Sequence, residues 1–160
     1  MAVIVRLSEK EVRVCAQLGM ERWLMKFGSQ DKPNYAEGKK AGRLEPELLA
    51  NVRANVSEWA VAKQYNLPWN VPWYPNELHT LRKNIADVGD FEVRTVRTKP
   101  SIPFWQKDAG RIIYGTKVLD EEYFSTVEIY GWFEADRYMI EPFADPEIGG
   151  WRVPIGELRV

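Results

Sequence analysis

Apolar positions recur along this chain with two different periods, helical in the first half and strand-like in the second. Residues 3–7 are apolar enough for a short first strand. The segment after them places three apolar residues at helical intervals: Val12, Cys15 and Leu18. Ser8 and Glu11 have the spacing of a capping box, and Gly28 is a suitable stop for this helix. We therefore predict a strand followed by a capped helix.

Residues 29–44 are polar, carry Gly, Pro and Lys, and show no period. We expect a flexible loop there, because a long irregular segment inside a compact domain is often functional or disordered. The second helix is predicted to start with Pro46 at its first position and to end near Asn66. Residues 67–78 are rich in Pro and Trp and are predicted to form no regular element. We expect Trp69 and Trp73 to cover the core, with base stacking as the alternative.

Four later segments carry β-branched and aromatic residues bounded by turn signals: 85–98, 110–119, 124–135 and 151–160. Helices therefore come early and strands dominate late. This order predicts an α+β fold, with a mixed or antiparallel sheet covered by the first two helices. With 160 residues and 45% hydrophobic content, the chain is expected to form a single domain spanning residues 1–160.

Composition excludes several classes of protein. No apolar run reaches the roughly 18 residues that a membrane span needs. One cysteine and one histidine leave no disulfide framework and no Cys- or His-rich zinc site. The N-terminal apolar stretch is too short for a secretory signal. We expect a cytoplasmic protein with no membrane partner; the sequence leaves its oligomeric state open, a homodimer included.

Charge is unevenly distributed, although the net charge is −1. Residues 80–117 contain eight Lys and Arg against four Asp and Glu, whereas residues 118–160 contain three Arg against ten Asp and Glu. A locally basic segment around a few carboxylates suits a protein that attracts phosphate and holds a cation. A random fluctuation of surface charge is the alternative.

The basic segment contains the sequence DVGDFEVRT, residues 87–95. A two-residue turn at 89–90 would pair Val88 with Phe91 and place Asp87 opposite Glu92, about 5 Å apart at their Cβ atoms. Arg94, two residues further on, would share their face. Carboxylates that face each other repel, and a divalent cation bound between them would offset this repulsion. The Val93 carbonyl could be a further oxygen ligand of such an ion. A solvated hairpin with one ion pair is the alternative.

Glu58 adds a third carboxylate to this prediction. Its neighbours on the second helix are small and apolar, which is unusual for a solvated glutamate. If buried, it needs a metal or an arginine as partner, because an unpaired buried charge is costly. A glutamate at the edge of a packed helix is the alternative. Asp108 could be a further acidic ligand, although a turn-forming aspartate is the more common reading.

A Glu on a helix, followed by an Asp and then by Glu-x-Lys on a strand, is the motif of the PD-(D/E)XK nuclease superfamily. This chain resembles that superfamily, in particular its small phage-encoded members. The matching stretches are SEWAVAK, IADVGD and FEVRT, with further likeness in GWFEAD and VPIGEL. The resemblance implies a restriction-endonuclease-like fold, an α/β-like core with a mixed β-sheet flanked by helices. It also implies Mg²⁺-dependent cleavage of DNA, with Mn²⁺ as a substitute ion, in the host cytoplasm if phage-encoded. The implied site comprises Asp87 and Glu92 as metal ligands, Glu58 as a supporting ligand, and Arg94.

Arg94 stands where the superfamily usually has lysine. Arginine cannot act as a base in a protein, so it would retain only the role of stabilising charge in the transition state. Lys99 and Lys107 are other candidates for a cation at the site, but the sequence does not place them there. A metal-dependent deoxyribonuclease is therefore the leading hypothesis. The alternative is a catalytically inactive nuclease-fold protein that binds nucleic acid or a host protein in counter-defence or regulation.

Overall fold

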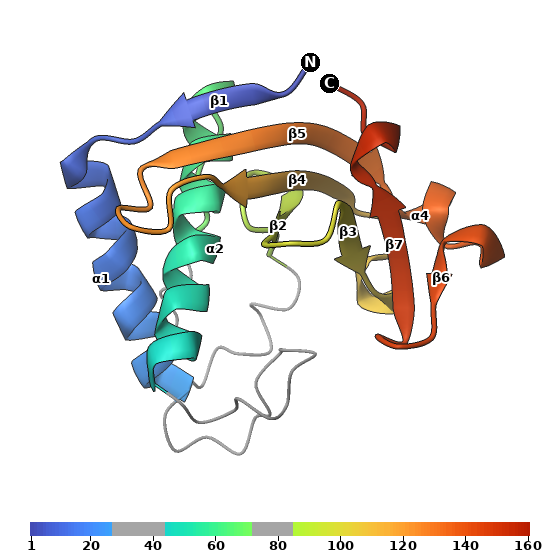
Figure 1. Cartoon of the computed structure of the whole chain (residues 1–160), viewed down its shortest axis with the longest axis horizontal. Coiled ribbons are helices and arrows are strands. Elements are labelled where there is room, and N and C mark those ends of the chain that lie inside the picture. The colour runs from blue at the N-terminus through green and yellow to red at the C-terminus, as the bar shows by residue number, and fades with distance from the viewer. Residues whose placement is uncertain (27–43, 72–84) are drawn as a thin grey trace.

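The elements described here come from a computed structural model, which describes residues 1–26, 44–71 and 85–160. Figure 1 shows their arrangement, with both long helices beneath a curved sheet. The longer elements are β1 (Val3–Arg6), α1 (Glu9–Lys26), α2 (Leu44–Tyr65), β2 (Phe91–Val96), β3 (Ser101–Phe104), β4 (Ile112–Val118), β5 (Thr126–Glu134) and β7 (Gly150–Pro154). The shorter ones are η3 (Gln106–Asp108), α4 (Ala135–Tyr138), η4 (Glu141–Phe143), β6 (Ala144–Asp145) and η5 (Ile155–Glu157).

The start of α1 is the predicted capping box. The Ser8 N–H donates to Glu11 Oε2 at 2.6 Å, and the Glu11 N–H donates to Ser8 Oγ at 3.3 Å. Two otherwise unpaired donors at the helix start are thereby satisfied. The predicted stop at Gly28 and the predicted loop at 29–44 lie outside the described residues, apart from residue 44, which belongs to α2.

α2 begins at Leu44, two residues before the predicted start at Pro46. Its end agrees with the prediction, since Asn66 takes a left-handed conformation with φ of 52°. The Leu67 N–H then donates to the Ala62 carbonyl oxygen at 2.9 Å. This bond reaches back five residues and satisfies a carbonyl that the helix leaves unpaired, as in a Schellman motif.

The larger sheet has the strand order β1-β5-β4-β2. β5 pairs antiparallel with both β1 and β4, whereas β4 pairs in parallel with β2. The predicted mixed sheet is therefore confirmed. A second, antiparallel sheet has the order β3-β7-β6. Its strands β3 and β6 were not predicted. β3 spans four residues and β6 spans two, which is too short for a clear alternating pattern.

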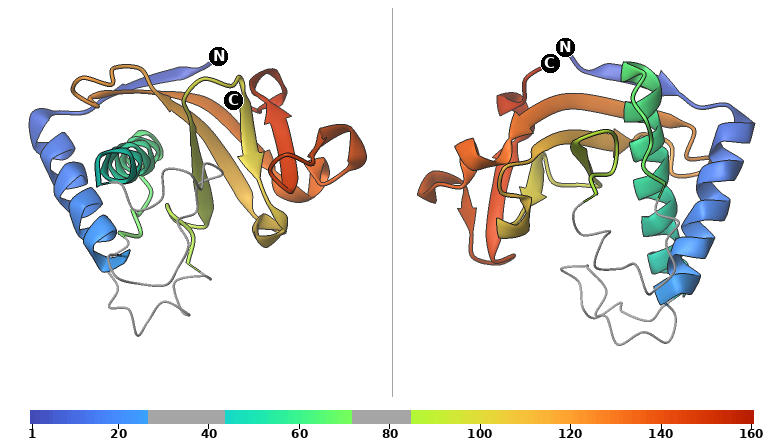
Figure 2. Two further views of the ribbon diagram at one scale, coloured as in Figure 1. Left: turned by 60° about the horizontal axis from the view of Figure 1, so that its bottom comes forward. Right: turned by 180° about the vertical axis from the view of Figure 1, so that it is seen from behind.

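The helices and the second sheet cover different parts of the larger sheet, as the two views of Figure 2 show. α2 packs against β2, β4 and β5, and α1 packs on α2. A chain of hydroxyl groups fixes α2 to the sheet: Ser57 Oγ lies 2.5 Å from Thr95 Oγ1, which lies 2.6 Å from Thr116 Oγ1. The fold is thus α+β, with a mixed sheet flanked by helices.

Two hydrophobic cores follow from these layers. One lies between the helices and the larger sheet and includes Val56, Val61 and Ile129. The other lies between the two sheets and includes Phe104 and Phe133. No helix within the described residues is long and apolar enough to cross a membrane.

Candidate functional site

The segment that carries Asp87 is held against the chain that leaves α2. The Asn70 side chain donates to the carbonyl oxygens of Ala86 at 2.9 Å and Gly89 at 2.8 Å. The Asn70 N–H donates to the Asp87 carbonyl oxygen at 3.0 Å, and the Gly89 N–H donates to that of Pro68 at 2.8 Å. Because α2 leads directly into these contacts, Asp87 is fixed beside the C-terminal half of that helix.

The predicted hairpin is only partly formed. Val88 and Phe91 exchange two hydrogen bonds, at 3.0 and 2.8 Å, around a turn in which Gly89 has φ of 54°. The prediction that Asp87 and Glu92 are cross-strand partners is wrong, because the antiparallel pairing stops at this one bridge. From Phe91 onward, β2 is instead paired in parallel with β4.

Asp87 nevertheless reaches the strand that carries Glu92. β2 lies at the edge of its sheet, so every second backbone N–H points away from β4. The Val93 N–H is one of these donors, and it donates to Asp87 Oδ2 at 2.9 Å. The Asp87 carboxylate therefore replaces a missing neighbouring strand at this point of the edge.

Arg94 brings the carboxylates together. Its Nη1 donates to Glu92 Oε2 at 3.2 Å and to the Val93 carbonyl oxygen at 3.3 Å, and lies 3.7 Å from Asp87 Oδ2. Its Nη2 donates to Asp108 Oδ1 at 2.7 Å. The Arg94 Nε is buried and has no hydrogen-bond partner among the described residues. One guanidinium group is thus shared by three carboxylates.

Asp108 is both a turn residue and a member of this cluster. Its backbone N–H donates to the Trp105 carbonyl oxygen at 2.9 Å, and its Oδ2 accepts the Trp105 N–H at 2.9 Å. The turn-forming role favoured by the sequence is therefore present. The side chain is also only 3% exposed and forms the shortest of the ion pairs of Arg94. Sequence spacing could not assign this contact, because 14 residues separate the two.

Glu58 is buried as its neighbours predicted, with 3% of its surface exposed. Its Oε1 accepts a hydrogen bond from Arg22 at 3.1 Å, and its Oε2 accepts one from the Trp69 indole at 2.9 Å. Burial raises the pKa of Glu58 to about 7; Arg22 opposes this rise and Asp87 adds to it. The Asp87 carboxylate thus acts electrostatically on Glu58, although the hydrogen-bond partners of Glu58 are Arg22 and Trp69.

Arg22, the partner of Glu58, was missed from the sequence. Its Nη1 also donates to Asn55 Oδ1 at 2.8 Å, so it joins α1 to α2. A signal was present: Arg22 follows Cys15 by seven residues and therefore lies on the same face of α1. Cys15 is buried against α2, as predicted, with its Sγ 3.7 Å from the Asn55 carbonyl oxygen. An arginine on that face needs a buried acid.

Negative charge is in excess around Arg94. Burial raises the pKa of Glu92, Asp87 and Asp108 raise it further, and Arg94 and Arg111 lower it. Burial by itself lowers the pKa of Arg94, but the three carboxylates outweigh burial and raise it. The repulsion from Asp87 and Asp108 that raises the pKa of Glu92 also favours an additional cation beside these carboxyl groups.

The cluster has oxygen atoms that could bind a divalent cation, but the described residues do not form a complete coordination site. Among the described residues, no three Asp, Glu, His or Cys side chains form a group that could hold a metal ion. Two carboxylates, Asp87 and Glu92, converge with the Val93 carbonyl oxygen, and Arg94 Nη1 lies at their meeting point. Both oxygens of Glu58 are engaged elsewhere. The donors suit Mg²⁺ in chemistry, and the position is shared with Arg94.

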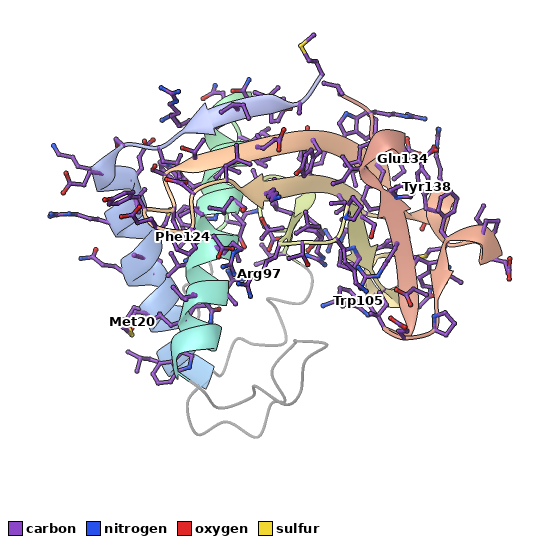
Figure 3. The ribbon with its side chains drawn as sticks, in the orientation of Figure 1. Met20, Arg97, Trp105, Phe124, Glu134 and Tyr138 are labelled. Atoms are coloured by element: carbon purple, nitrogen blue, oxygen red, sulfur yellow. The ribbon has the colours of Figure 1, made fainter. Side chains whose placement is uncertain are left out.

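The remaining lysine candidates contact residues that are not members of this cluster. Lys99 Nζ lies 3.9 Å from Glu147, and Lys107 Nζ lies 5.9 Å from the ring of Trp105, which Figure 3 labels. Trp69 packs on the core, as expected, and its indole also serves Glu58. Trp73, which was also expected to cover the core, lies outside the described residues.

No family model, curated protein or solved structure matches this chain. Its function is therefore inferred from the geometry of the cluster formed by Asp87, Glu92, Arg94 and Asp108, with Glu58 beside it. We refer to these five residues as the acidic site.

Proposed function

We propose that this chain is a divalent-metal-dependent nuclease that cleaves DNA, with the restriction-endonuclease-like fold of the PD-(D/E)XK superfamily. The observation that carries the proposal is the convergence of Asp87 Oδ2, Glu92 Oε2 and the Val93 carbonyl oxygen on one point at the edge of β2. These are the hard oxygen donors that Mg²⁺ and Mn²⁺ prefer. The phage origin and the cytoplasmic location stay predictions from the sequence.

Three of the acidic residues have a role in the reaction. Asp87 and Glu92 hold the cation, which when bound polarises a phosphate oxygen and lowers the pKa of a water. Glu58 is fixed by Arg22 and Trp69, and from there it orients a water or adds negative charge that favours the cation. The reaction is a hydrolysis: a water oxygen bonds to phosphorus and the bond from phosphorus to one sugar oxygen breaks. The proton that the water loses balances the one that the departing sugar oxygen gains through solvent, which leaves a phosphomonoester and a hydroxyl group.

Arg94 serves this reaction only as a cation. Its three acidic neighbours keep it protonated, so it takes no proton from water. A guanidinium beside the scissile phosphate stabilises the negative charge that develops on the phosphate oxygens. Residue 94 therefore cannot act as the proton acceptor that a lysine could be at this position.

The position of Arg94 Nη1 also favours a second candidate function. Because this nitrogen lies where the cation would bind, a chain that never releases it would have no metal-dependent activity. Such a protein would bind nucleic acid or a host protein and leave it intact. The two functions share a fold and differ in one measurable property, cleavage.

A plasmid-nicking assay in Mg²⁺ or Mn²⁺ tests the proposal. We expect the wild-type protein to nick supercoiled DNA and both Asp87→Ala and Glu92→Ala to lose this activity. Asp90→Ala is the matched control, because Asp90 is an exposed acid in the adjoining turn and is expected to leave the activity unchanged. Undiminished nicking by Asp87→Ala would reject the proposed site.

An absence of cleavage by the wild type in either ion would reject the nuclease. In that case, a gel-shift titration with the same DNA distinguishes the second function from an unrelated one. Binding that weakens steeply with salt would support a nucleic-acid-binding protein, because phosphate contacts release counterions.

A further inference from the structure

We propose that Arg94 is a tethered occupant of the cation position, so that the seated guanidinium and a metal ion exclude each other. The inference rests on the proposed function and concerns the regulation of the same site. It makes Arg94 a gate whose displacement admits the ion.

The exclusion follows from the contacts of a single atom. Arg94 Nη1 lies 3.2 Å from Glu92 Oε2, 3.3 Å from the Val93 carbonyl oxygen and 3.7 Å from Asp87 Oδ2. A Mg²⁺ ion held by the same oxygens needs distances of about 2.0–2.1 Å to each of them. The three oxygens cannot surround both centres at once, and the two like charges repel.

The two terminal nitrogens of the Arg94 guanidinium are held by contacts of different strength, so that the group can rotate about the stronger one. Its Nη2 makes a short, charge-assisted bond of 2.7 Å to Asp108. The contacts of Nη1 are all longer, and the buried Nε makes no hydrogen bond to the described residues. Rotation about the Nη2 contact would therefore break the weaker contacts and keep the strongest one. Asp108 is the fixed end of the gate because Trp105 holds its other oxygen.

Two consequences distinguish this gate from a purely structural arginine. In the wild type, a metal ion has to displace Nη1, so its observed affinity is lower than that of the three oxygens alone. When Arg94 is replaced by an uncharged side chain, both the occupant and the repulsion disappear. Metal affinity should then rise, whereas an arginine that neither occupied nor opposed the cation position would leave it unchanged or, through local disorder, reduce it.

The test is a Mn²⁺ titration, with free Mn²⁺ measured by electron paramagnetic resonance at constant ionic strength. We expect Arg94→Met to bind Mn²⁺ at least about tenfold more tightly than the wild type, because a unit charge next to the ion is removed. Arg97→Met is the matched control: Arg97, labelled in Figure 3, lies just past β2, is 59% exposed, and should leave Mn²⁺ affinity unchanged.

A second variant keeps the test decisive if three carboxylates without Arg94 prevent folding. The double variant Arg94→Met/Asp108→Asn removes the buried ion pair as a unit and leaves Asp87 and Glu92 in place. We expect it to bind Mn²⁺ as tightly as Arg94→Met. Adding Asp87→Asn to either variant should abolish the gain, which assigns the ion to this site.

Unchanged or weaker Mn²⁺ binding in both Arg94 variants would overturn the gate. Tight binding by these variants, with no DNA cleavage by any variant or by the wild type, would support the gate and reject the nuclease. Conversely, cleavage by the wild type combined with no gain in Mn²⁺ affinity would support the nuclease and reject the gate.

Discussion

Replacing Asp108 by alanine tests whether this residue anchors the acidic site. The side chain of Asp108 is 3% exposed and that of Arg94 is 18% exposed, so their ion pair is largely shielded from water. Asp108→Ala removes that partner and also the acceptor of the Trp105 N–H. The surrounding chain keeps its other contacts, so the loss reports on these two interactions.

The expected cost follows from those interactions. Breaking a buried ion pair by removing one partner costs about 3–5 kcal/mol. Arg94 keeps Glu92 and Asp87 as partners, so the cost falls below this range, at roughly 2 kcal/mol. The lost hydrogen bond of Trp105 adds about 1 kcal/mol. The total of about 3 kcal/mol corresponds to a fall of roughly 9 °C in melting temperature for a chain of this length.

Thermal unfolding followed by far-ultraviolet circular dichroism measures this loss. Asp136→Ala is the matched control, because Asp136 is exposed and accepts one backbone N–H, from Gly110 at 2.8 Å. We expect the control to cost about 1 kcal/mol or less. If Asp108→Ala lowers the melting temperature no more than the control does, the buried ion pair contributes nothing and the reasoning is refuted.

Two further predictions concern stability away from the acidic site. Burial raises the pKa of Glu11, but hydrogen bonds from donors that include Ser8 and Trp59 outweigh it and lower this pKa to about 2. The stability that Glu11 contributes is therefore present above its ordinary pKa of 4.5 and is lost as the pH falls toward 2. Glu11→Gln should lower the melting temperature at pH 7, with a deficit that shrinks across that window; a deficit independent of pH would contradict this. Gly131 has φ of 134°, and an added Cβ would collide with the Arg159 carbonyl oxygen. Gly131→Ala should therefore cost about 3 kcal/mol or more in denaturant unfolding, and an unchanged midpoint would contradict it.

Local patterns in the sequence determined the elements and one feature of the site. The capping box at Ser8, the end of α2 near Asn66 and the turn at Gly89 depend on neighbouring residues, and all three are present. The burial of Glu58 followed from its apolar neighbours on one helix. Such features are predictable because hydrogen bonds and side-chain contacts within a few residues decide them.

The pairing of segments beyond these local contacts could not be predicted from local patterns in the sequence. Asp87 and Glu92 were expected to face each other in a hairpin, but the strand after the turn pairs with β4. Strand pairing is decided by which segment covers the free edge and buries the apolar face, and local alternation of residues is the same for both outcomes. The error therefore lies in the pairing, while the predicted turn at Gly89 and the strand after it are both present.

The sequence by itself thus determined an α+β chain with a buried glutamate and a short acidic segment. The sequence had also placed Arg94 on the face of Asp87 and Glu92. The tertiary structure decided the partners that lie far apart along the chain: Arg22 from α1 for Glu58, and Asp108 for Arg94. The physical reason is that charge interactions act through space and need no fixed spacing along the chain. Only the packed fold could bring Arg22 to Glu58 and Asp108 to Arg94, because 36 and 14 residues separate these partners along the chain.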